Sequence, residues 1–191
     1  MRRFLIGVLL LTAAGCSEPP QKELDQAQSA IDAARAAGAE TYAAPEYADA
    51  TATLAKARAS IDERDYRQAL SFALAARQRA DEASRLVPEA RTHAKATADA
   101  AFAAASSSAV RLESSLRAAE AAKVPARELH APRATLATAR TSLQEARILL
   151  DHGNFTEATP ALLAVRKKLD LAAAEVTSIP PRAKAGKGSR R

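Results

Sequence analysis

The feature that most constrains the fold of this chain is its abundance of alanine combined with a scarcity of glycine. Alanine dominates the stretch from Gln21 to Val176, and no glycine lies between Gly38 and Gly153. Alanine has the highest helix propensity of all residues, and Leu, Arg, Glu, Gln and Lys supply most of the other positions. No alternating run of Val, Ile and Thr predicts a strand. We therefore predict an all-α fold.

An internal repeat divides the helical body. A shift of 89 residues places YADATATLAKARASIDERDYRQAL (47–70) over LATARTSLQEARILLDHGNFTEAT (136–159). The matches fall at helical steps of three and four, as when Ala50 meets Ala139 and Leu54 meets Leu143. Each copy predicts a helix, a tight turn and a second helix. We expect an elongated antiparallel helical bundle built from two related helical hairpins, followed by a disordered basic C-terminal tail.

Three residues of each copy are candidates for fixing its hairpin. The first is expected to cap the second helix with its side-chain oxygen, the second to anchor that helix in the core, and the third to let the helices approach closely. These structural candidates are Asp65, Tyr66 and Ala69 in the first copy, and Asn154, Phe155 and Ala158 in the second. Gly153 supplies the permissive backbone of the second turn.

Prolines set the expected helix limits. The predicted helices cover 21–37, 44–63 (opened by Ala44-Pro45), 65–86, about 88–123 (started or kinked by Pro88), 131–151 (opened by Ala131-Pro132) and 154–176. Pro160 lies inside the last of these and removes one hydrogen bond, so we expect a kink there.

The N-terminus has the pattern of a secretory signal. Arg2 and Arg3 precede the apolar run FLIGVLLLT (4–12), and the small residues at 13–15 come directly before Cys16, the single cysteine. A run of about 9 residues is too short to cross a bilayer, which needs roughly 20.

This arrangement resembles bacterial lipoproteins, whose lipobox ends in a small residue followed by cysteine. The resemblance implies cleavage between Gly15 and Cys16 and lipidation of the Cys16 thiol, so a covalent lipid is the only cofactor expected. Ser17 after the cysteine resembles the outer-membrane sorting choice of Gram-negative lipoproteins. The alternative is an ordinary signal peptide that ends near a cysteine. An exported chain with one free thiol and no disulfide partner would be unusual, however.

The segment Ala43 to Ala83 carries a second resemblance. RDYRQAL within it is similar to the turn of tetratricopeptide repeats, but the 89-residue offset differs from their period. The Ala-Pro helix start and the Asp-Tyr-x-x-Ala turn resemble domain-of-unknown-function family 4398, whose members are Ala-rich bacterial envelope lipoproteins. The resemblance implies a helical envelope protein of undefined activity.

The formal net charge of +6 is concentrated at the two ends of the chain. Without Arg2, Arg3 and the five basic residues of the tail, 21 basic groups face 22 acidic ones. The tail residues that could contact anions are Arg182, Lys184, Lys187, Arg190 and Arg191. Two readings of the tail stay open: a solubilising end, or an arm that contacts anionic envelope material.

No catalytic motif is apparent, and we expect no enzyme and no metal site. The histidines, His93, His130 and His152, form no metal-spaced pair with each other or with cysteine. We expect His93 to be exposed, His130 to precede a helix and His152 to lie at a helix C-terminus. Ser106 to Ser108 lie in an alanine-rich run without the strained turn of a nucleophilic serine.

The predicted organisation is a signal peptide (1–15), a lipidated N-terminus with the first helix (16–44), a first hairpin (45–87), a long connecting helix (88–124), a second hairpin (131–176) and the tail (177–191). The leading hypothesis is a non-catalytic outer-membrane lipoprotein that acts as a spacer or protein-interaction module in the periplasm. Its expected partners are membrane lipid, with peptidoglycan or envelope proteins as further candidates, and a homodimer through a leftover apolar stripe. The alternative is an anion- or nucleic-acid-binding protein that acts through the tail, although an exported chain is not expected to meet nucleic acid. A carrier of an apolar ligand is a third alternative.

Overall fold

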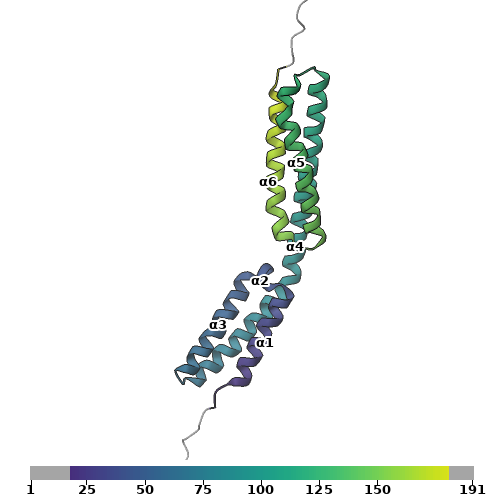
Figure 1. Ribbon diagram of the computed structural model, residues 1–191. Helices are drawn as coiled ribbons and strands as arrows, with labels where there is room; N and C mark the ends of the chain where they lie inside the picture. Colours follow the sequence, from purple (N-terminus) through teal and green to yellow (C-terminus); the bar gives the residue numbers. More distant parts are fainter. Residues whose placement is uncertain (1–17, 181–191) are drawn as a thin grey trace, which may run out of the picture. The chain divides into compact units, whose positions relative to one another are not determined.

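The computed structural model describes residues 18–180, which form six helices and no strand (Figure 1). The helices are α1 (Gln21–Ala37), α2 (Ala39–Tyr42), α3 (Ala44–Asp62), α4 (Tyr66–Ala121), α5 (Ala126–Asp151) and α6 (Phe155–Ser178). The prediction of an all-α fold is confirmed. The predicted signal peptide and the five basic tail residues fall on 1–17 and 181–191, outside the described residues.

The chain divides into two compact units, with the boundary between Ala90 and Arg91. The N-terminal unit contains α1, α2, α3 and the first part of α4, and the C-terminal unit contains the remainder of α4 with α5 and α6. Within each unit, each long helix runs antiparallel to the long helix that follows it (Figure 1). Both predicted hairpins are present, α3 with α4 and α5 with α6, and each is completed by one further helix.

The core of the N-terminal unit is lined by a stripe of alanine on α4. Its alanines are completely buried and follow each other at alternating steps of four and three: Ala69, Ala73, Ala76, Ala80 and Ala83. This spacing keeps one seam of the helix against its neighbours, as in coiled coils. Larger side chains from α1 and α3, among them Ile31 and Leu54, fill the space that the small alanines leave.

Helix α6 carries the same seam in the C-terminal unit, shifted by 89 residues. Its buried positions are Phe155, Ala158, Leu162, Leu169, Ala172 and Val176, and Val165 between them is partly buried. At this shift Leu162 corresponds to Ala73 of α4, and Leu169 corresponds to Ala80. The repeat therefore extends along the whole third helix of each unit, well beyond the turn that revealed it in the sequence.

Two predicted helix boundaries are wrong. Helix α4 continues through Pro88, and α5 begins at Ala126, so that Pro132 lies inside it. Proline removes one backbone hydrogen bond from a helix, but Val87 and Pro132 are buried in the two cores, and this packing opposes a break at either position. The short helix α2 was not predicted; it follows Gly38, whose φ of 97° ends α1.

Candidate functional site

The two turns aligned by the repeat have the same backbone hydrogen bonds. In the first turn, the amides of Glu63, Arg64 and Asp65 donate to the carbonyls of Ala59, Ile61 and Ser60 at 3.1, 2.9 and 2.8 Å. In the second, the amides of His152, Gly153 and Asn154 donate to those of Ile148, Leu150 and Leu149 at 3.0, 3.0 and 2.8 Å. These bonds satisfy carbonyls that the helix end leaves unpaired, so the two hairpins are closed by one mechanism.

The side-chain caps of the two turns differ. Asp65 Oδ1 accepts a hydrogen bond of 3.0 Å from the backbone amide of Gln68. The cap predicted for Asn154 is wrong, because its side chain makes no capping hydrogen bond. Asn154 has φ −84° and ψ 57°, outside the extended region in which a capping side chain faces the next helix. Only the first hairpin therefore has a side-chain cap at this position.

Of the two predicted core anchors and the two small residues predicted to let the helices approach, three are buried. Ala69 and Ala158 are completely buried, and Phe155 is buried in the C-terminal unit. Tyr66, its counterpart in the N-terminal unit, is partly exposed. In both copies these residues lie at the start of the second helix; Phe155 is buried in the core there, whereas Tyr66 is only partly buried.

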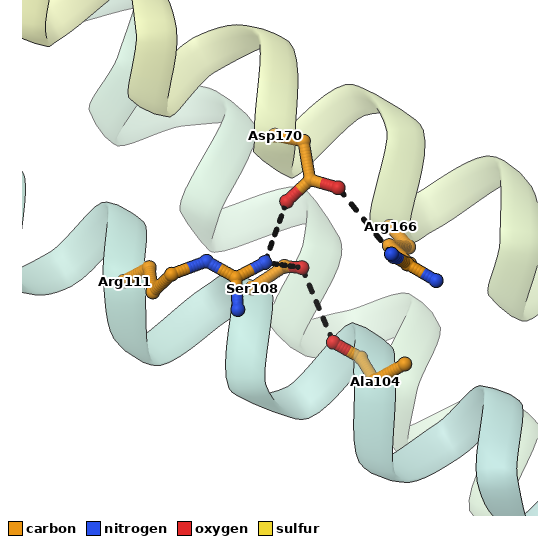
Figure 2. Close-up of polar contacts among 5 residues, drawn as sticks. All are labelled: Ala104, Ser108, Arg111, Arg166 and Asp170. Atoms are coloured by element: carbon orange, nitrogen blue, oxygen red, sulfur yellow. Dashed lines mark hydrogen bonds and ion pairs between the residues drawn. The ribbon is translucent and has the colours of Figure 1, made fainter.

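A polar cluster between α4 and α6 was not predicted (Figure 2). Arg111 lies on α4 and donates from Nη2 to Oδ1 of Asp170 on α6 at 2.9 Å and to the Ser108 hydroxyl at 2.6 Å. The completely buried Ser108 hydroxyl donates to the carbonyl of Ala104 at 3.1 Å. Arg166 Nε lies 3.5 Å from the other carboxylate oxygen of Asp170.

Hydrogen bonding to Ser108 is the main factor that lowers the pKa of Asp170, and it outweighs the opposing effect of partial burial; Arg111 lowers this pKa further. The Ser108 hydroxyl has a single proton, for which the Ala104 carbonyl competes with the carboxylate. We therefore regard Arg111, and not Ser108, as the residue that consistently donates a hydrogen bond to Asp170. The repeat carried a signal for part of this cluster, since Arg77 and Asp81 occupy the equivalent positions and form an ion pair of 3.9 Å.

A second polar contact that the sequence analysis missed joins α3 and α4 in the N-terminal unit. Arg79 Nε lies 2.6 Å from Asp49 Oδ2, and Arg79 Nη1 donates to the Thr53 hydroxyl at 2.9 Å. Thr53 is buried, whereas both charged side chains are about half exposed. The basic side chain thus holds a carboxylate and a hydroxyl of the neighbouring helix at the same time.

A groove of about 300 Å³ lies between α5 and α6 in the C-terminal unit. Helix α5 lines it with hydroxyl and methyl groups, and α6 contributes one apolar and one cationic side chain. The lining residues are Ala134, Thr135, Thr138, Ala139, Ser142, Val165 and Lys168. The groove therefore combines a cationic residue and hydroxyl-bearing residues with apolar ones.

The three histidines lie apart from this groove. His93 and His152 are exposed, and His130 is an exposed residue inside α5, so the prediction that it precedes a helix is wrong. Among residues 18–180, no group of three His, Cys, Asp or Glu side chains is placed to hold a metal ion. Ser106 and Ser107 lie with Ser108 inside α4.

The predicted lipidation and cleavage residues, Cys16 and Gly15, lie outside the described residues, as do the five basic tail residues. No helix within 18–180 has the length and apolar character needed to cross a membrane.

Comparison of the chain with curated proteins and with solved structures finds no match. A protein family matches residues 22–119, just over half of the 191-residue chain, and its description is "Domain of unknown function (DUF4398)". The matched region runs from α1 almost to the end of α4, and extends well beyond the segment 43–83 that carried the resemblance in the sequence. On this match, the chain belongs to the DUF4398 family.

Proposed function

We propose that this protein is a non-catalytic, lipid-anchored envelope protein that acts as a spacer or protein-interaction module, facing the periplasm from the outer membrane. The single observation that carries the proposal is Cys16, the only cysteine, which follows a charged start, an apolar run and three small residues. A thiol placed there has a chemical use as the attachment point of a lipid, while no second cysteine is available for a disulfide.

The start of α1 supports a role close to the membrane. Helix α1 begins at Gln21, five residues after Cys16. Five residues span at most about 18 Å when fully extended. Acyl chains on Cys16 would therefore hold the N-terminal unit next to the bilayer surface, and several chains would anchor it firmly, at roughly 0.8 kcal/mol per buried methylene.

The helical units support a role in protein interaction. Each unit presents the outer faces of three antiparallel helices, and a partner helix can dock on surfaces of this kind. A pull-down of the acylated protein from envelope membranes should recover an envelope protein or a wall fragment. If it recovers neither, the interaction role is wrong, although the anchor itself could still be correct.

Metabolic labelling with a palmitate analogue tests the anchor directly. The native chain and a Ser17→Ala control should incorporate the label, and Cys16→Ala should not. Mass spectrometry of the native mature chain should find an acylated Cys16 as its first residue. An unmodified thiol, or a mature chain that starts elsewhere, would overturn the proposal.

A further inference from the structure

The repeat permits a comparison of the two units residue by residue. The buried seams of α4 and α6 coincide at a shift of 89 residues, and so do the turns before them. At the same shift Lys168 corresponds to Arg79, Thr138 to Asp49, and Ser142 to Thr53. The groove between α5 and α6 thus occupies the position at which the N-terminal unit makes its contact between α3 and α4.

In the N-terminal unit the basic residue of this position is neutralised within the chain. Arg79 binds the carboxylate of Asp49 at 2.6 Å and also donates to the Thr53 hydroxyl. This contact shows that the face between the two helices accommodates a carboxylate beside a cation and a hydroxyl group.

In the C-terminal unit the cation and the hydroxyls are present without that carboxylate. Threonine replaces aspartate at position 138, and Lys168 has no ion pair or hydrogen bond among the described residues. Its neighbour on the same helix, Arg166, is paired with Asp170. Thr138 and Ser142 line the same groove as Lys168.

From these observations we propose that the groove between α5 and α6 is a binding site for the carboxylate of an external ligand. Lys168 and the hydroxyls of Thr138 and Ser142 bind the carboxylate, which takes the role that Asp49 has in the N-terminal unit. The inference does not depend on the lipid anchor.

The apolar part of the groove limits what the carboxylate is attached to. Ala134, Ala139 and Val165 are the apolar lining residues, and the volume of about 300 Å³ admits only a small group. The ligand is therefore a carboxylate joined to a short aliphatic or sugar-sized substituent.

The net charge of the unit also favours an anion, since its residues 91–180 include twelve basic and nine acidic side chains, a net charge of +3.

Titration of the full chain in a neutral detergent, observed by NMR of labelled valine methyl groups, tests the site. Val165 lies in the groove, whereas Val87 is buried in the other unit and serves as an internal reference. N-acetylalanine should shift the Val165 resonance with a dissociation constant in the millimolar range, because exposed ion pairs are weak. Its uncharged amide should shift this resonance much less. Glucuronate forms a second arm that separates a sugar carboxylate from a peptide carboxylate.

Three variants and one control variant show whether the named groups bind the probe. Lys168→Met should weaken binding about tenfold or more, since it removes the charged donor, and Lys167→Met, an exposed neighbour outside the groove, should not. Thr138→Asp should weaken binding at least as strongly, because it restores the aspartate of the N-terminal unit and pairs it with Lys168. The reverse change, Asp49→Thr, should free Arg79 and create a second site, detected as a second bound probe.

A response of Val165 to either carboxylate, weakened in Lys168→Met and Thr138→Asp, supports the proposal and identifies the source of the carboxylate. Equal responses to the acid and its amide, or no response to either carboxylate, would overturn it. Unchanged binding by Thr138→Asp, with the circular dichroism of the native chain, would overturn it as well.

Discussion

Arg64 and Gly153 occupy the same position in two equivalent turns, with φ of 62° and 79°, although only one of them is glycine. Both lie in the left-handed region, where a side chain clashes with the backbone and glycine is favoured. The two turns have matching hydrogen bonds, so the backbone geometry is imposed by the hairpin and not by the residue at this position. The first hairpin therefore contains strain that the second avoids.

This difference predicts opposite effects of two substitutions. Gly153→Ala should lower the free energy of unfolding by about 1–2 kcal/mol, the cost of a left-handed non-glycine residue. The added Cβ would lie 3.0 Å from Arg91 Nη2, but that end of a flexible side chain can move. Arg64→Gly should raise the free energy of unfolding by about 0.5 kcal/mol, because relief of strain exceeds the entropy cost of glycine. Urea unfolding of the full chain, followed by circular dichroism, measures both. Losses of equal size in the two variants would contradict this account of the turns.

The unequal caps give a second prediction. Asp65→Ala removes the acceptor of the Gln68 amide and should cost about 1 kcal/mol of unfolding free energy. Asn154→Ala removes no capping bond and should change it by less than about 0.5 kcal/mol. Hydrogen exchange at the Gln68 amide provides a local readout, which should accelerate in Asp65→Ala only. If both substitutions cost the same, the carboxylate of Asp65 does not act as a cap.

The core seams give a third prediction, at the equivalent positions Ala80 and Leu169. Both residues are completely buried. Leu169→Ala leaves a cavity in the C-terminal unit and should cost about 2–5 kcal/mol, whereas Ala80→Leu overpacks the alanine seam of the N-terminal unit and should cost about 1–3 kcal/mol. Leu163→Ala is the matched control, since Leu163 is 51% exposed on the same helix as Leu169 and should cost little. A gain in stability from Ala80→Leu would show that the alanine seam is loosely packed.

Some parts of this structure are predictable from the sequence, and others are not. Helical periodicity and alanine content predicted the fold class, and Pro45 correctly marked the start of α3, because local propensity and core packing agree there. Prolines misled the prediction at Pro88 and Pro132. Their local cost is fixed, but whether a helix breaks depends on the packing of its neighbours in space, which the sequence alone does not show.

The polar contacts between helices could not be predicted from the local sequence either. Asp49 and Arg79 are thirty residues apart, and nothing in their local sequence pairs them. The pair can be predicted only once it is known how α3 and α4 are aligned against each other in the folded hairpin. The aligned repeats show that Thr138 replaces Asp49 in the second unit. The importance of this change becomes clear only from the contact between Asp49 and Arg79 in the folded first unit.

The cluster around Asp170 predicts a dependence of stability on pH. Its pKa is lowered in the folded protein by the neighbouring Ser108 hydroxyl and by Arg111, so the ionised carboxylate is favoured by folding. This contribution to stability is complete above the unfolded pKa of about 3.9 and is lost as the pH falls through the lower folded value. Because the Asp170 side chain is 42% exposed, we expect a contribution of less than about 1 kcal/mol.

Asp170→Asn isolates this contribution from that of the other carboxyl groups. At pH 7 the variant should unfold at a lower urea concentration than the native chain, and the difference should shrink as the pH falls below about 4. Added salt at pH 7 should also reduce the difference, since the Arg111 and Arg166 ion pairs are exposed to solvent. Glu175→Gln on the same helix, a carboxylate without an ion pair among residues 18–180, is the control and should show no such trend. A difference between native chain and Asp170→Asn that persists unchanged into acid would mean that shape and packing at position 170, and not its charge, stabilise the contact between α4 and α6.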